Sequence, residues 1–224
     1  MAQSRTNATA ELLQDDQVSR LFDILAQHIE PRTELNWETP LDILVAAVLS
    51  AQSTDRKVNE VTAGLWRECR EPEDYLKLGE EDLRSRISSI GLYRNKAKAI
   101  IGICRELCDR HGGQVPDELD ALIRLPGVGR KTANVVLNVA FGQPAIAVDT
   151  HVHRVSNRTG LVQTSKPATT EEALLRRVPE KHRLHAHHYL ILHGRYTCKS
   201  RRPECWRCPV SGVCNYPCKT SLPG

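Results

Sequence analysis

The sequence predicts an all-α fold, and three observations lead to this prediction. Apolar residues recur at helical spacing along most of the 224 residues, and no segment gives a convincing strand or an internal repeat. Aromatic residues make up only 4% of the chain, although strands favour aromatic and β-branched side chains. Capping residues, prolines and glycines stand where helices are expected to begin and end. Hydrophobic residues amount to 40%, which is enough for a sizeable core.

The predicted helices follow from this spacing. They span residues 15–30, 40–51, 54–69, 72–77, 80–88, 94–111, 117–124, 130–141, 150–158, 169–178 and 181–194. The first carries its apolar residues on one face and ends at Pro31, because the residue before a proline avoids the helical conformation. The polar segment up to about Gln14 is expected to be frayed.

Capping signals place the next boundaries. Thr39 is the expected N-cap of the second helix, with Pro40 in its first turn, and the run LDILVAAVLSA is apolar on all sides, which indicates a central buried helix. Ser53 or Thr54 caps the helix that runs through Cys69.

The later boundaries rest mainly on glycines. The turn Gly91–Tyr93 precedes a long helix that Gly112 and Gly113 end. The tight run Leu125–Gly129 separates the next two helices. Asp149 caps a helix that Gly160 ends, and Thr169 with Glu172 forms the expected capping box of the following one.

Composition limits the class of protein. The net charge of +4 is a mild basic excess, which is weak evidence for nucleic-acid binding by itself. No apolar run reaches the length of a membrane span, and the first residues lack the apolar core of a signal peptide. We therefore expect an intracellular, cytoplasmic protein with no membrane partner. Its eight cysteines are then better explained as ligands or core residues than as disulfides.

Four cysteines form a compact motif near the C-terminus. Cys198, Cys205, Cys208 and Cys214 have the spacing C-x6-C-x2-C-x5-C in a segment that is expected to be loop. Zinc sites more often use two C-x2-C pairs held far apart, whereas one compact run of four suits a cubane iron–sulfur cluster. The spacing favours the cluster and leaves a structural zinc as the alternative.

The other cysteines and the basic residues of this segment have simpler explanations. Cys104 and Cys108 lie one helical turn apart and are expected to be buried, and Cys218 is expected to be a bystander. Basic residues flank the first cysteine gap, and they either form a solvated surface or contact phosphates. They are Arg195, Lys199, Arg201, Arg202 and Arg207.

A helix–LPGVG–helix segment is the second strong signal. Gly127 and Gly129 allow a tight turn that leaves amide N–H groups at the start of the 130–141 helix, where a phosphate can bind. An ordinary helical hairpin is the alternative. Lys131 lies in the first turn beside Arg130, and both the helix dipole and that arginine disfavour its ammonium form. The lysine is therefore a possible nucleophile, or else a phosphate-binding residue.

Asp149 follows an apolar segment and is a candidate acid. Its alternative role is that of a helix N-cap, and the two roles are compatible. Asp149, Thr150 and His151 are too close in sequence to form a hydrolase triad. Three histidines on the last long helix are expected to be packed residues rather than metal ligands; they are His187, His188 and His193.

Taken together, these motifs resemble the endonuclease III family of bifunctional DNA glycosylases. The resemblance runs from about residue 15 to 216, and the four-cysteine spacing fits without insertion. The N-terminal extension and Cys218 lie outside it, and residues 160–190 match only loosely. The matching segments, in order, are LSAQSTD, GLYRNKA, LPGVGRKTA, VDTHVHR, LILHGRYTC and the cysteine motif.

The resemblance implies two helical domains with a DNA groove between them. One is a six-helix barrel at about 33–143, with a helix–hairpin–helix motif at about 117–141. The other joins 1–32 to 144–224 and holds a [4Fe–4S] cluster. The implied partner is double-stranded DNA that carries a damaged pyrimidine or an abasic site, and the protein is expected to act as a monomer, associated with the nucleoid.

The resemblance also implies roles for single residues. The enzyme flips the damaged base out of the duplex; Gln52 then fills the gap and Leu92 acts as a wedge beside it. Lys131 attacks the sugar C1′, a Schiff base forms and β-elimination breaks the strand, while Asp149 assists the attack. The implied DNA contacts are Gln52, Leu92, Tyr93, Gly127, Gly129, Arg130, His151, Arg154, Lys199, Arg201 and Arg202.

Three other classes remain as alternatives, and one of them is a zinc-stabilised scaffold protein. An adenine-mismatch glycosylase shares the hairpin, the acid and the cysteine spacing, but generally lacks a lysine at the position of Lys131. A non-enzymatic hairpin module that binds DNA needs neither Lys131 nor Asp149.

Overall fold

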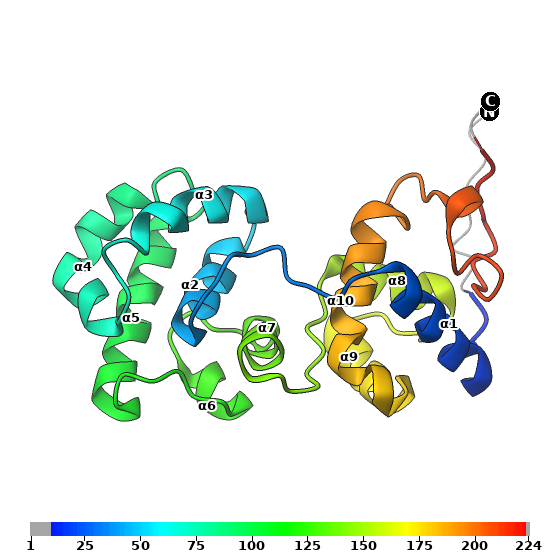
Figure 1. Ribbon diagram of the computed structural model, residues 1–224, viewed down its shortest axis with the longest axis horizontal. Coiled ribbons are helices and arrows are strands. Elements are labelled where there is room, and N and C mark those ends of the chain that lie inside the picture. The colour runs from blue at the N-terminus through cyan, green and yellow to red at the C-terminus, as the bar shows by residue number, and fades with distance from the viewer. Residues whose placement is uncertain (1–9, 223–224) are drawn as a thin grey trace. The chain divides into compact units, whose positions relative to one another are not determined.

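All regular structure in residues 10–222, the part of the chain that the computed structural model describes, is helical (Figure 1). The predicted all-α class is therefore confirmed. The elements are α1 (Asp15–His28), α2 (Pro40–Ser50), α3 (Asp55–Leu65), α4 (Pro72–Arg86), α5 (Tyr93–His111), α6 (Leu119–Arg124), α7 (Arg130–Phe141), α8 (Thr150–Thr159), α9 (Pro167–Arg177), α10 (Glu180–Tyr196) and the 3-10 helix η1 (Cys205–Arg207). Within that range, none of them has both the length and the apolar character needed to cross a bilayer.

The helices belong to two compact units. We call Thr33–Gln143 the continuous unit, and the segments before and after it together the discontinuous unit. In the continuous unit α2 is central, because it contacts α3, α5 and α7. Every residue of Leu41–Leu49 is buried, as the apolar sequence of this helix predicts.

The discontinuous unit has a core of its own. Helix α10 contacts both α1 and α8, and α8 contacts α9 (Figure 1). The apolar face of α1 is fully buried in this core through Val18, Leu21, Phe22 and Leu25. Burial of a side chain of this size contributes about 1.5–3 kcal/mol. The face predicted from helical spacing is therefore the one that joins the N-terminal segment to the C-terminal part of the chain.

Most predicted caps are confirmed. The Thr39 side chain accepts a hydrogen bond from the Asp42 N–H, and the Asp42 carboxylate accepts one from the Thr39 N–H, which forms a capping box. Gly112 and Gly160 end α5 and α8 in the left-handed conformation. The two short helices predicted around residues 72–88 are α4, in which Gly79 adopts a non-helical conformation with φ +79°.

Two predicted boundaries are wrong in the local signal on which they rested, and several other predicted helix ends differ from the observed ones by one or two residues. Helix α3 ends at Leu65 rather than Cys69, because the Leu65 carbonyl accepts from the N–H groups of both Glu68 and Cys69 and closes the helix in a turn. Helix α9 begins at Pro167, so Thr169 is inside its first turn and its hydroxyl donates to the Lys166 carbonyl at 2.9 Å. A proline at the first helical position is the stronger local signal.

The expected fraying of the N-terminal segment falls partly on residues 1–9, which lie outside the described residues. For Ala10–Leu13 the expectation is wrong. Both Ala10 and Leu13 are buried, and the Leu13 N–H donates to the Gly160 carbonyl at 2.8 Å. A Cβ at position 160 would lie 2.1 Å from the Glu11 carbonyl oxygen, so the close approach of this segment requires the glycine.

Candidate functional site

The predicted hairpin is present in the continuous unit between α6 and α7. Leu125 and Val128 point into the core, whereas Pro126, Gly127 and Gly129 are exposed. Gly127 has φ +74°, and a Cβ there would lie 2.7 Å from the Ala99 Cβ. The turn therefore presses against α5 at a position where only glycine fits.

The hairpin leads directly into the start of α7. Gly129 is the N-cap, and its carbonyl accepts from the Ala133 N–H at 2.9 Å, so α7 begins at Arg130. The amides of the first helical turn have no partner within the helix, which makes this end a site for an anion. Lys131 is exposed, and its amine has no hydrogen bond or ion pair with any residue in the described range 10–222.

Gln52 and Leu92 lie on two loops of the same unit. Both are exposed, and they are the two non-glycine residues with positive φ in the described part of the chain, at 56° and 59°. Gln52 follows the end of α2, and Leu92 is the N-cap of α5. Tyr93 is half-buried, and the Arg94 guanidinium lies over its ring at 5.2 Å.

Asp149 is in the discontinuous unit, at the start of α8. Its Oδ1 accepts a hydrogen bond from the Val152 N–H at 2.8 Å, so the predicted capping role is confirmed. The chain enters through the buried segment 146–148, which leaves Asp149 half-buried. Its Oδ2 has no hydrogen-bond partner within residues 10–222 and remains available.

The two predicted DNA contacts on α8 are already engaged with this unit. The Arg154 guanidinium donates to the carbonyls of Gly194 at 2.8 Å and Cys198 at 3.1 Å, and it lies 3.3 Å from His151 Nδ1. Burial lowers the pKa of Arg154. The guanidinium therefore ties α8 to the end of α10; a contact with DNA stays a prediction for both residues.

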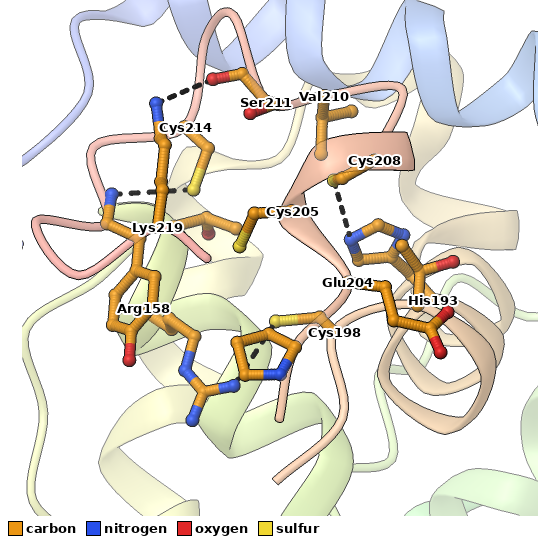
Figure 2. A pocket seen from close by; sticks show the side chains of 14 residues that line it. Arg158, His193, Cys198, Glu204, Cys205, Cys208, Val210, Ser211, Cys214 and Lys219 are labelled. Atoms are coloured by element: carbon orange, nitrogen blue, oxygen red, sulfur yellow. Dashed lines mark hydrogen bonds between the residues drawn. The ribbon is translucent and has the colours of Figure 1, made fainter. Parts of the chain in front are cut away.

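The four motif cysteines line one pocket of the discontinuous unit, and Figure 2 shows their sulfur atoms around a shared space. The chain brings them together by short-range hydrogen bonds. The Cys198 N–H donates to the His193 carbonyl at 2.8 Å, and the Cys208 and Cys214 amides donate to the carbonyls of Cys205 and Val210. Among the described residues, no group of three or more histidine, cysteine or carboxylate side chains is arranged to hold a single metal ion.

The surroundings of these thiols disfavour the free thiolate form. Burial raises the pKa of Cys198, Cys208 and Cys214, and for Cys208 it raises the value to about 12. Neighbouring cysteines also raise the pKa of Cys208 and Cys214, because negative charges repel. These buried thiols therefore ionise together only if positive charge enters with them. Four cysteines are the donor set of a [4Fe–4S] cluster and also of a structural zinc ion. Among the described residues the four sulfur atoms are not arranged around a single ion, which favours the larger cluster.

Arg158 contacts the cysteine pocket, and the sequence analysis did not identify it as a residue of this site. It lies one turn after Arg154 on α8, and its Nη1 donates to Cys198 Sγ at 3.6 Å and to the Lys199 carbonyl at 2.8 Å. Its Nη2 donates to the Ser200 carbonyl at 3.1 Å, and the guanidinium lies 4.9 Å from the centre of the Tyr216 ring. The interaction with Arg158 opposes the rise in the Cys198 pKa. Nothing in the spacing of the motifs marks these long-range contacts.

The basic residues of the cysteine segment differ in whether they are paired. Lys199 Nζ donates to Glu204 at 2.8 Å, and the Arg207 guanidinium binds the same carboxylate. Arg201 and Arg202 are exposed and have no ion pair with the described residues 10–222. Of the five basic residues, these two are free to meet an external phosphate.

The remaining cysteines and histidines follow the predictions with one exception. Cys104 is buried, but Cys108 is half-exposed and lies 3.5 Å from the Glu73 carboxylate, so the prediction that it is buried is wrong. The three histidines of α10 are buried, as predicted. One of them, His193, lies with Nε2 3.6 Å from Cys208 Sγ.

The sequence matches a family model described as "HhH-GPD superfamily base excision DNA repair protein" over residues 45–180, more than half of the chain. Endonuclease III of Rickettsia conorii is 50% identical over 200 residues, which cover 89% of this chain and 95% of that protein. Endonuclease III of Escherichia coli strain K12 is 50% identical over 192 residues, covering 86% and 91%.

Solved structures agree with these matches. A trapped endonuclease III–DNA covalent intermediate, in an estranged-adenine complex, superposes with a TM-score of 0.86 at 44% identity. The superposition covers 92% of this chain and 97% of that one.

Proposed function

The chain belongs to the endonuclease III family of the HhH-GPD superfamily of base excision DNA repair proteins, and we propose that Lys131 and Asp149 carry its chemistry on damaged pyrimidines. It is a bifunctional enzyme, a DNA N-glycosylase that is also an AP lyase. The observation that carries the residue assignment is the exposed, unpaired Lys131 amine beside the first amides of α7. These amides bind a backbone phosphate without reading sequence, which presents the adjacent sugar to the lysine.

The proposed reaction starts at the flipped nucleotide. Lys131 Nζ attacks C1′ of the sugar, the bond from C1′ to the base breaks, and the base departs with the bonding electron pair. The C1′–O4′ bond then breaks and the sugar ring opens, with the amine giving up a proton and O4′ taking one, which leaves an imine at C1′. The imine acidifies C2′, and loss of a C2′ proton expels the 3′ phosphate, so the strand breaks on the 3′ side. A trapped covalent intermediate between the similar endonuclease III and DNA supports a covalent step.

We assign two roles to Asp149 in this reaction. Through Oδ1 it caps α8, and its half-buried carboxylate is held rigidly at the end of that helix. A carboxylate held in this way stabilises the positive charge that develops on the sugar as the base departs. The unpaired Oδ2 is the atom that we assign to stabilising this charge.

The proposed cofactor is a [4Fe–4S] cluster held by Cys198, Cys205, Cys208 and Cys214. Such a cluster supplies cross-links between its four ligands rather than chemistry at the sugar. Its ligands flank the segment that carries Arg201 and Arg202, the two unpaired cations. We infer that the cluster keeps these cations in place for contact with phosphates. A yellow-brown protein with visible absorption supports the cluster. A colourless protein that contains zinc would show instead that the four cysteines bind a zinc ion.

The proposed substrate is duplex DNA with one oxidised pyrimidine, such as thymine glycol, or with an abasic site. On the duplex, Gln52 fills the gap left by the flipped nucleotide and Leu92 is the wedge beside it. We expect the protein to act as a monomer on nucleoid DNA. Size-exclusion chromatography of the protein–DNA complex checks this, because it gives the number of protein chains per duplex.

Borohydride trapping tests the assignment directly. The purified protein is incubated with a duplex that carries a single thymine glycol, and the imine is reduced to a stable amine. We expect a covalent adduct with the wild type and none with Lys131→Ala. Lys77→Ala is the matched control, because Lys77 is an exposed lysine of α4 whose amine lies 3.5 Å from the Asp74 carboxylate.

Each failure has a distinct meaning. If Lys131→Ala still forms the adduct, another amine is the nucleophile. If the wild type binds the duplex and removes a base without forming an adduct, the chemistry is that of a monofunctional adenine-type glycosylase. Binding with neither activity would indicate a non-enzymatic hairpin module.

A further inference from the structure

Gln52 and Leu92 are held in an unfavourable backbone conformation. Both lie in the left-handed region, which non-glycine residues rarely adopt, and both are on exposed loops. Such a conformation persists only when the surroundings impose it. Contacts with neighbouring elements must therefore hold Gln52 and Leu92 in this conformation.

Lys96 contacts both loops from within α5. Its side chain is almost completely buried, with 5% exposed. Its Nζ donates to the carbonyls of Leu49 at 2.9 Å and Ala51 at 2.5 Å, and it lies 3.5 Å from Ser53 Oγ. These three groups surround Gln52 in the chain. The backbone N–H of Lys96 donates to the Leu92 carbonyl at 3.1 Å, which closes the first turn of α5.

The two loops also touch one another. A Cβ on Gly91, the residue before Leu92, would lie 3.5 Å from the Gln52 carbonyl oxygen. The Lys96 side chain thus binds the segment on each side of Gln52, and the Leu92 turn meets that segment through Gly91. The bond from the Lys96 N–H to the Leu92 carbonyl is an ordinary helical bond that does not depend on the side chain. The last carbonyls of α2 have no partners within the helix and lie at its negative end, so they are suited to accept hydrogen bonds from the Lys96 amine, although burial lowers the pKa of this lysine.

We propose that Lys96 is a positioning residue for base flipping: it presets Gln52 and Leu92 as a pair before DNA binds. This rests on the proposed function, in which these two side chains enter the duplex. A lysine that only ended α2 would make the contacts to Leu49 and Ala51. It would not need to lie one turn after Leu92 on the helix that Leu92 caps.

The test uses Lys96→Met, which keeps the length of the side chain and removes the ammonium. Lys98→Met is the matched control, because Lys98 is an exposed lysine of the same helix. The probe is a duplex in which 2-aminopurine stands opposite a tetrahydrofuran analogue of an abasic site, which cannot form the imine and is not cut. Its fluorescence rises when the base is unstacked. At saturating protein we expect a smaller rise with Lys96→Met, and thymine glycol removal about tenfold slower. Lys98→Met should match the wild type in both.

A double-variant comparison separates positioning from simple stability. Lys96→Met is combined with Gln52→Ala and Leu92→Ala, and rates are normalised to the active fraction measured by borohydride trapping. If Lys96 acts through the two side chains, its substitution adds little to their loss, so the effects are strongly non-additive. Additive losses, or a wild-type fluorescence rise in Lys96→Met, would overturn the proposal.

Two further outcomes keep the interpretation clear. If Lys96→Met melts below the assay temperature, Lys96→Gln, which retains a donor, takes its place in the same comparison and should give an intermediate fluorescence rise. A Lys96→Gln whose loss of rate is additive with the losses from Gln52→Ala and Leu92→Ala would overturn the proposal. If the wild type itself forms no borohydride adduct, the proposed function fails, and the positioning role fails with it.

Discussion

The hairpin of the continuous unit and the cysteine segment of the discontinuous unit both carry many basic residues, yet they use them differently. At the hairpin, Lys131 is exposed and makes no ion pair within the described residues. Around the cysteines, most cations are engaged: Lys199 binds Glu204, and Arg154 and Arg158 bind backbone carbonyls. Arg201 and Arg202 are the residues of that segment that, like Lys131, are exposed and make no ion pair within residues 10–222.

This difference shows that a basic residue near a functional motif is not by itself a phosphate contact. The free energy of binding a phosphate comes from an unpaired charge, whereas a charge that is already hydrogen-bonded must first give up its partners. The cations that hold the protein together and those that meet the ligand are distinguished only by their partners. Two of the following predictions, those for the cysteines and the arginines, compare an engaged residue with an unengaged one of the same type.

The largest effect is expected for a cysteine of the pocket. Cys205→Ser should abolish the visible absorption of the cluster and lower Tm by about 10 °C or more, because a structural metal site contributes directly to folding. Cys218→Ser should leave both unchanged, since Cys218 is exposed and does not line the pocket. Absorption spectra and thermal melts of the two variants check this. Equal loss in both would mean that Cys218 is a ligand.

Asp149 tests whether one residue serves both structure and chemistry. Asp149→Asn should slow base removal by about 100-fold, because the amide cannot stabilise positive charge, while stability stays near that of the wild type. Asparagine caps a helix as well as aspartate does. Asp149→Ala should lose the cap as well and cost about 1 kcal/mol. Single-turnover kinetics and urea unfolding measure the two effects, and a wild-type rate in Asp149→Asn would reduce Asp149 to a capping residue.

The arginines give the clearest contrast between engaged and free cations. Arg158→Met should destabilise the protein by about 2 kcal/mol, because three acceptors lose their donor, and it should leave the salt dependence of DNA binding unchanged. Arg201→Met combined with Arg202→Met should do the opposite. It should leave stability unchanged and reduce the slope of log K against log salt by about 2. Affinity for DNA measured across a series of salt concentrations distinguishes the two cases. An unchanged slope in the double variant would mean that Arg201 and Arg202 do not contact phosphates.

A smaller effect is expected at the hairpin glycines. Gly127→Ala should cost about 1–2 kcal/mol, because φ is +74° and the new Cβ would meet the Ala99 Cβ at 2.7 Å. Gly129→Ala should cost less than about 1 kcal/mol, because its φ is −90° and no atom lies within 4 Å of the new Cβ. Chemical denaturation compares the two. Equal costs would show that the turn does not depend on its close approach to α5.

The sequence predicted what depends on neighbours within a few residues. Thr39 and Asp42 form their capping box, Gly112 and Gly160 end their helices, and Asp149 caps α8, because each of these interactions spans at most one helical turn. The four motif cysteines also line one pocket, as their compact spacing indicated. The catalytic roles of Lys131 and Asp149 stay predictions, although the structure describes the surroundings of each.

Other features could not be predicted, because their partners are far away in the chain. The segment Ala10–Leu13 looks polar and frayed, yet Gln163 Nε2 donates to the Ala10 carbonyl at 2.8 Å across more than a hundred residues. The sequence predicts Cys108 as a buried small residue, but the fold leaves it half-exposed beside the Glu73 carboxylate of α4, at 3.5 Å. Lys96 looks like one more surface lysine of a helix, and only the fold places it beneath the end of α2.

The sequence by itself therefore determined the all-α class, most helix ends, the hairpin, the cysteine set and the membership of the endonuclease III family. The tertiary structure decided which cations are engaged, which loops are held strained, and which lysine holds them. The physical reason is the distance along the chain between the residues that interact. Caps and turns are satisfied by the nearest few residues, whereas the burial and pairing of a long charged side chain depend on whatever element the fold brings beside it.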